Sequence, residues 1–155
     1  MPYRQKVTGI PALSVFYNIE HSVGTGCSNV REDVMLVQYM LGAFFSGPML
    51  GSGSSKPHSR LEVDGTCGPI TIEYIRAFQH VVASQVSGEV DGRISTPTGI
   101  VGPRHGRHYS IVALNMLLAR TRRALFMTLP WAPDMPPNVK TLLMRPEEPV
   151  GRFTL

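Results

Sequence analysis

Long hydrophobic runs are missing from this chain of 155 residues. No apolar stretch approaches the ~20 residues that a helix needs to cross a bilayer, so we expect no membrane span. Near the N-terminus, Arg4 and Lys6 precede an apolar stretch, but Gly9 and Pro11 interrupt it, and Glu20 follows where small residues would mark a cleavage site. The sequence therefore predicts synthesis in the cytoplasm without a signal peptide.

Cysteine and charge are also scarce. The two cysteines, Cys27 and Cys67, have no metal-type spacing, which favours free thiols and leaves a disulfide open. Charged residues make up 17% of the chain against 43% hydrophobic ones, which is enough apolar material for one core. The formal charge of +4 favours anionic surfaces without selecting nucleic acid, a wall polymer or an acidic protein.

The N-terminal region contains one clear strand pattern. Apolar residues occupy the odd positions from Leu13 to Ile19, and β-branched and aromatic residues are frequent there. This strand is the only one that the pattern predicts, so its backbone groups need a partner in the chain's own termini or in another subunit.

Three later segments have apolar residues at helical spacing, and each has a start signal. Asn29 and Glu32 form a variant of the capping box, Pro69 suits a first helical turn, and Ser110 can cap a helix. The three apolar stripes are Val30, Val34, Val37 and Leu41; Ile72, Ile75, Phe78 and Val82; and Ile111, Leu114, Leu117 and Leu118.

The C-terminal segment is rich in proline, which prevents a long helix and favours extended backbone. It also holds Phe126, Trp131 and Phe153, so we expect it to lie along its own domain or a neighbour's. The fold class predicted is mainly α: a compact three-helix domain over 29–123, an N-terminal arm with one strand over 1–28, and an extended Pro-rich C-terminal arm over 124–155.

A turn sequence occurs twice. "VDGTCGPIT" at 63–71 and "VDGRISTPT" at 90–98 place Asp64 and Asp91 27 residues apart. In each, the aspartate can bond backbone just downstream, and the glycine can adopt a positive φ at low cost. The repeat predicts two chain reversals of the same kind.

At these residues the chain resembles the peptidoglycan-binding domain family, whose small three-helix modules are attached to cell-wall hydrolases and occur in phage and injection machinery. The resemblance covers residues 29–118. Val37-Gln38 with Leu41 is similar to the family's "LQ..L", the run from Val63 to Gln79 to its "VDG..GP.T......FQ", and Val90-Asp91-Gly92 to its second turn. The chain departs from the family by an insertion over 95–108, before the last helix.

The resemblance implies a groove beside the 63–71 turn, with Asp64, Thr71, Tyr74 and Gln79 as candidate ligand-binding residues. Phe78 lies on the apolar stripe and is expected in the core, whereas Tyr74 and Gln79 are expected at the surface. Polar groups there would hydrogen-bond wall glycan or peptide.

Other chemistry is less well supported by the sequence. Asp64 and Asp91 fit paired catalytic carboxylates less well than two structural turns. His105 and His108, with His58, His80 or Cys67, lack a tight metal-ligand cluster, and a basic loop with Arg104 and Arg107 is the favoured interpretation. We therefore expect no enzyme activity, no metal and no cofactor.

Two functions remain after these exclusions. The first is a non-catalytic structural or docking subunit of a phage tail or contractile injection assembly, oligomeric and located in the virion or injection particle. The second is a free-standing peptidoglycan-binding protein of the cell wall. The expected partners are other subunits or peptidoglycan, and not nucleic acid.

Overall fold

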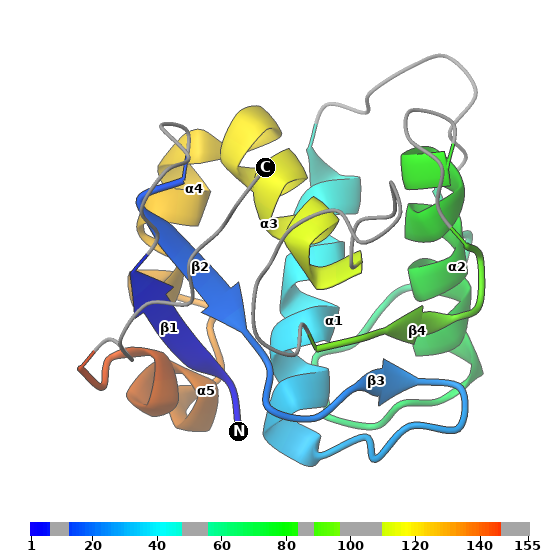
Figure 1. Cartoon of the computed structure of the whole chain (residues 1–155), viewed down its shortest axis with the longest axis horizontal. Coiled ribbons are helices and arrows are strands. Elements are labelled where there is room, and N and C mark those ends of the chain that lie inside the picture. Colours follow the sequence, from blue (N-terminus) through cyan, green and yellow to red (C-terminus); the bar gives the residue numbers. More distant parts are fainter. Residues whose placement is uncertain (7–12, 48–55, 84–88, 97–109, 147–155) are drawn as a thin grey trace.

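The computed structural model describes residues 1–6, 13–47, 56–83, 89–96 and 110–146, and these residues form a mainly helical fold with short strand pairs (Figure 1). The strands are β1 (Tyr3–Lys6), β2 (Val15–Asn18), β3 (Val23–Gly24) and β4 (Arg93–Ile94). The helices are α1 (Arg31–Ser46), α2 (Pro69–Ala83), α3 (Ser110–Thr121), α4 (Arg123–Met127) and α5 (Pro137–Leu143), with a 3-10 turn at Leu129–Trp131.

The three predicted helices are confirmed, and two of them begin at the predicted residues, Pro69 and Ser110. The capping interpretation of Asn29 is wrong. Asn29 adopts a left-handed φ of 51°, and its side chain bonds the N–H and C=O of Gly24, 2.8 and 3.1 Å away. It closes the loop before α1, which starts after Val30 without a side-chain cap.

The N-terminal segment holds more strand than predicted. β1 pairs antiparallel with β2, with Arg4 opposite Tyr17, so the partner that β2 needs comes from the chain's own terminus. β3 pairs with β4. The sequence of β1, YRQK, has no apolar alternation, which is why only one strand was predicted over 1–28.

The opposite edge of β2 is bonded by a side chain. Asn115 of α3 accepts the N–H of Tyr17 at 2.8 Å and donates to its C=O at 2.9 Å. A buried amide thus takes the place of a further strand and satisfies backbone groups that burial would otherwise leave unpaired.

The expectation of an extended C-terminal segment over 124–155 is wrong for 124–127 and 137–143, which belong to α4 and α5. Two of its prolines lie at helix starts: Pro130 is in the first positions of the 3-10 turn, and Pro137 begins α5, where a missing N–H leaves no helical bond unmade. Residues 147–155, including Phe153, lie outside the described residues.

All three predicted segments contribute to one hydrophobic core. It contains Phe16 from β2, Phe44 and Phe78 from α1 and α2, and Phe126 and Leu143 from the C-terminal helices. The central helix is α1, which contacts α2, α3 and α5 and lies between the β1–β2 pair and the β3–β4 pair (Figure 1). Within the described residues, no helix is both long and apolar enough to cross a bilayer.

Candidate functional site

The first repeated turn is held by a glutamine of α1. The side-chain oxygen of Gln38 accepts the N–H of Gly65 at 2.9 Å. Its Nε2 lies 2.9 Å from Asp64 Oδ1, 3.0 Å from the C=O of Thr66 and 3.0 Å from Thr71 Oγ1. Asp64 Oδ1 also accepts the Thr66 N–H at 2.8 Å. One buried amide therefore joins α1, the turn and the start of α2.

The second repeated turn is held in the same way by a glutamine of α2. Gln79 accepts the N–H of Gly92 at 2.8 Å. Its Nε2 lies 2.7 Å from Asp91 Oδ1, 2.9 Å from the C=O of Arg93 and 3.2 Å from Ser110 Oγ. The four partners match those of Gln38 one for one: the aspartate, the glycine N–H, the carbonyl two residues after the aspartate, and a hydroxyl of the next helix.

The two aspartates have local structural contacts. Each accepts a backbone N–H two residues downstream and the amide of its own glutamine. For Asp64, the hydrogen bonds from Thr66 and Gln38 lower the carboxyl pKa, against a smaller opposing effect of burial. A carboxyl held ionised in this way is poorly suited to act as a general acid near neutral pH.

The structure does not bring the four predicted ligand-binding residues together: two lie at the first turn, one at the second turn, and Tyr74 at neither. Asp64 is exposed and Thr71 is buried, and both contact Gln38 at the first turn. Gln79 belongs to the second turn. The expectation that Tyr74 and Gln79 lie at the surface is wrong, because they are only 2% and 3% exposed. The ring of Tyr74 packs edge-on against Phe45, and its hydroxyl donates to the Ser59 C=O at 2.9 Å.

A groove of about 160 Å³ does lie beside the first turn. Its lining includes Gln38, Asp64 and Thr71, together with the exposed side chains of Arg60 and Ile70. The groove is smaller than the 300–1,000 Å³ usual for small-molecule sites. Both polar and apolar residues line it, and it is a surface groove, not a deep cavity.

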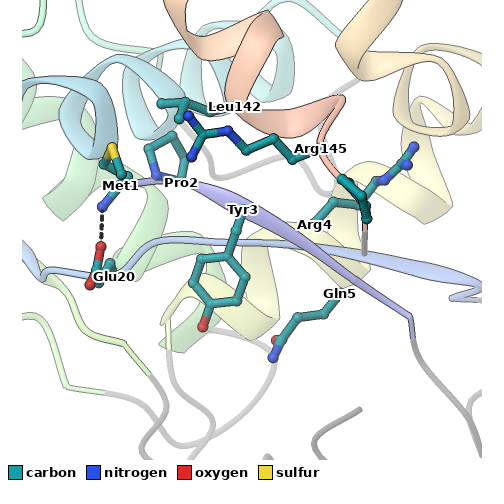
Figure 2. Close-up of a pocket in the computed structure, with 9 residues that line it drawn as sticks. Met1, Pro2, Tyr3, Arg4, Gln5, Glu20, Leu142 and Arg145 are labelled. Carbon is teal, nitrogen blue, oxygen red and sulfur yellow. Dashed lines mark hydrogen bonds and ion pairs between the residues drawn. The ribbon is translucent and has the colours of Figure 1, made fainter. Parts of the chain in front are cut away.

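A larger hollow of about 380 Å³ lies between β1 and α5 (Figure 2). Pro2 and Leu142 form its apolar wall, and the side chain of Arg145 runs back along them. At one end the Met1 amine donates to Glu20 at 2.7 Å. No predicted site residue lines this hollow.

Metal-ligating residues do not gather in the part of the chain that the structure describes: no group of three or more His, Cys, Asp or Glu is placed to hold an ion. His58 and His80 are exposed. The insertion over 95–108 lies outside the described residues from position 97 on, and with it Arg104, His105, Arg107 and His108.

Sequence reasoning missed a fully buried carboxylate, Asp33 of α1. It accepts the backbone N–H groups of Glu20 and His21 at 3.3 and 3.1 Å, and His21 Nδ1 lies 3.2 Å away. These contacts tie the chain after β2 to the start of α1. The available signal was an acidic residue directly before the buried Val34, inside an apolar helix.

Large apolar side chains are exposed on the C-terminal helices. Trp131 is 51% exposed, Met127 41% and Met144 47%. The guanidinium of Arg4 lies 5.8 Å from the centre of the Trp131 ring, a cation–π contact. We call Met127, Trp131 and Met144 the exposed apolar residues of the C-terminal helices.

Comparisons with protein-family models, with curated proteins and with solved structures gave no significant match.

Proposed function

We propose that this protein is a non-catalytic module of the peptidoglycan-binding type that acts as a structural or docking subunit of a phage tail or contractile injection assembly. Its partners are other subunits of that assembly, and its working location is the virion or injection particle. The proposal rests on what the repeated turns do and on what the surface leaves exposed.

The repeated turns support a non-catalytic role. Asp64 and Asp91 are the acids that the repeat singles out, and each is bonded to its own turn and its own glutamine. Acid–base catalysis requires a carboxyl within hydrogen-bond reach of a substrate proton. In this protein the Oδ1 atoms of Asp64 and Asp91 accept hydrogen bonds from their own turns and from the glutamines of α1 and α2.

The observation that carries the docking role is the half-exposed Trp131, with Met127 and Met144 exposed on the same C-terminal helices. Tryptophan is enriched among the residues that dominate binding energy at protein interfaces. Methionine adapts its shape to a partner surface at little strain. Large apolar side chains left in water are stabilised when another protein covers them.

Trp131 is the only tryptophan of the chain, so it reports its own environment. We expect its fluorescence emission to shift to shorter wavelength as protein concentration rises and copies associate. Light scattering coupled to size exclusion measures the same association as mass. Trp131→Ala should weaken the association about tenfold or more, because it removes a central apolar contact.

The matched control is Ile70→Ala, which removes a 41% exposed apolar side chain from the start of α2. It should leave the association unchanged. If the wild-type protein stays monomeric at every concentration and its fluorescence emission is constant, copies of the chain do not dock to one another through Trp131.

The second candidate function is binding of peptidoglycan, and the groove beside the first turn is the observation that favours it. A groove of this size buries little ligand, so the affinity of one copy is modest. Sedimentation with insoluble peptidoglycan separates the two functions. A wall binder is retained as wild type and as Trp131→Ala, and an Arg60→Ala, Ile70→Ala double variant of the groove rim is released.

A further inference from the structure

The hollow between β1 and α5 has the size and the apolar wall of a binding site. Its volume of about 380 Å³ lies within the 300–1,000 Å³ usual for small-molecule sites. Pro2 and Leu142, which are both buried, and the exposed Pro146 line it. This wall favours contact with an aliphatic group, because such a contact removes apolar surface from water.

Arg145 adds a positive charge to this wall. Its side chain is exposed, and Figure 2 shows it running along Pro2 and Leu142. The Arg145 guanidinium makes no ion pair with any residue that the structure describes. A guanidinium can donate two parallel hydrogen bonds to one carboxylate. Arg145 can therefore bind a carboxylate that enters the hollow.

Arg4 is the second arginine of the hollow. Figure 2 shows its side chain extending toward the opposite end from that of Arg145. The Arg4 guanidinium lies 5.8 Å from the centre of the Trp131 ring. Glu20 also lines the hollow, but the Met1 amine donates to it at 2.7 Å and offsets its charge. The lining as a whole is therefore positive, with an arginine toward each end.

Positive charge is also concentrated in the two segments that supply β1 and α5. Among the described residues of 1–6 and 110–146, the only Asp or Glu is Asp134, which accepts the Tyr39 hydroxyl at 2.7 Å. The Lys and Arg residues of these segments are Arg4, Lys6, Arg120, Arg122, Arg123, Lys140 and Arg145. In the described parts of 13–96, by contrast, Asp and Glu outnumber Lys and Arg. An acidic partner is therefore attracted to the half of the molecule that contains the hollow.

We propose that the hollow between β1 and α5 binds an acidic peptide segment of a partner protein, in which Glu or Asp side chains flank an aliphatic one. One carboxylate pairs with Arg145, a second lies toward Arg4, and the aliphatic side chain contacts Pro2 and Leu142. The site is distinct from the docking surface proposed above, because Met127, Trp131 and Met144 do not line the hollow.

The lining favours a peptide over nucleic acid or a membrane. Single-stranded nucleic acid is bound by charged grooves with aromatic side chains on which bases stack. The aromatic lining residue, Tyr3, points away from Leu142 in Figure 2, and its hydroxyl accepts the Asn18 amide at 2.9 Å. A bilayer surface contacts protruding side chains, whereas Pro2 and Leu142 are buried in the wall.

The test adds a capped tetrapeptide of alternating glutamate and leucine to the full chain at pH 7 and low salt, and follows the backbone amides by NMR. We expect the largest shifts at Arg4, Leu142 and Arg145, with saturation at one peptide per chain. The counterpart peptide with glutamine in place of glutamate should bind about tenfold more weakly, because hydrogen bonds to a charged acceptor are the stronger ones. Added salt should weaken the acidic peptide, because Arg145 is exposed to solvent.

Arg145→Gln should weaken binding of the acidic peptide about tenfold. The matched control is Arg123→Gln, which removes an exposed positive charge outside the hollow and should leave the dissociation constant unchanged. An amide spectrum of Arg145→Gln that matches wild type away from position 145 shows that this variant is folded.

Three results would overturn the proposal: no shifts at the hollow, equal weakening by Arg145→Gln and Arg123→Gln, or tighter binding at the same amides by an oligothymidylate or by vesicles that contain phosphatidylserine. Association of copies through Trp131 is measured by light scattering without the peptide. Failure of the peptide to bind therefore leaves the docking role standing, and a chain that stays monomeric leaves this test intact.

Discussion

The two repeated turns are held by the same four contacts, yet they lead into different structures. After the first turn, α2 begins at Pro69, four residues beyond Gly65. After the second turn the chain enters β4 and pairs with β3, and α3 begins only at Ser110. The glutamine, aspartate and glycine therefore form a local unit that is independent of the segment that follows.

The surroundings of the two glycines show where the turns differ. Both adopt left-handed backbone, with φ of 77° at Gly65 and 73° at Gly92. Gly65 lies against the backbone of Arg31 at the start of α1, whereas the atoms nearest the missing Cβ of Gly92 belong to the side chains of Thr25 and Arg76. A Cβ at position 65 would therefore meet backbone of α1 as well as side chains, whereas a Cβ at position 92 would meet side chains alone.

The largest expected effect tests whether the two glutamines are equivalent. Gln38→Met and Gln79→Met should each lower the free energy of unfolding by about 4 kcal/mol, because each leaves buried polar partners without a hydrogen bond. The two amides share no hydrogen-bond partner, so the double variant should show the sum of the two losses. Urea unfolding measures the free energy of unfolding of the two single variants and the double variant. A loss below about 1 kcal/mol for either single variant would show that the two glutamines are not equivalent.

The next effect should separate the two turns. A Cβ at position 65 would lie 3.0 Å from the Arg31 backbone oxygen and 2.5 Å from its Cγ, whereas at position 92 the nearest atoms are side-chain atoms 3.0 and 3.1 Å away. Gly65→Ala should cost about 3 kcal/mol and Gly92→Ala about 1.5 kcal/mol. Urea midpoints of the two variants give the difference, and equal losses would show that backbone strain alone decides both positions.

The smallest effect concerns the exposed Asp64. Its pKa is lowered in the folded state, so its contribution to stability is present above the unfolded carboxyl pKa and is lost as the pH falls through the folded value. Asp64→Asn should cost less than about 1 kcal/mol at pH 7, since the group is exposed to solvent. The difference from wild type should shrink toward pH 2.5 in urea titrations; a constant difference would assign it to geometry and not to charge.

Much of the helical framework could be predicted from the chain. Pro69 and Ser110 begin helices where the local signals place them. A first-turn proline acts on its own backbone, whereas the Ser110 hydroxyl accepts the Gln79 amide at 3.2 Å. Asn29 was misassigned because its side chain can serve a cap or a loop equally well, and only the position of Gly24 selects the loop. The short helices α4 and α5 were not predicted either. Pro137 begins α5, but a proline in a proline-rich segment is equally typical of extended backbone.

The candidate site was harder to predict than the fold. Thr71 and Asp64 come together at the first turn as the repeat suggests, but Gln79 and Tyr74 are buried. Helical spacing places both off the apolar stripe, and it carries no information about what covers that side of α2. The second turn and residue Ser59 cover it.

The sequence by itself determined the starts of α2 and α3, the apolar stripes and the two Asp-Gly reversals, because these depend mainly on residues close to one another in the chain. Only the tertiary structure decided which polar groups are buried, that β1 pairs with β2, and that Asn115 bonds the far edge of that strand. Those contacts join residues up to 98 positions apart, and whether a distant backbone group arrives at a given side chain depends on the packing of the whole core.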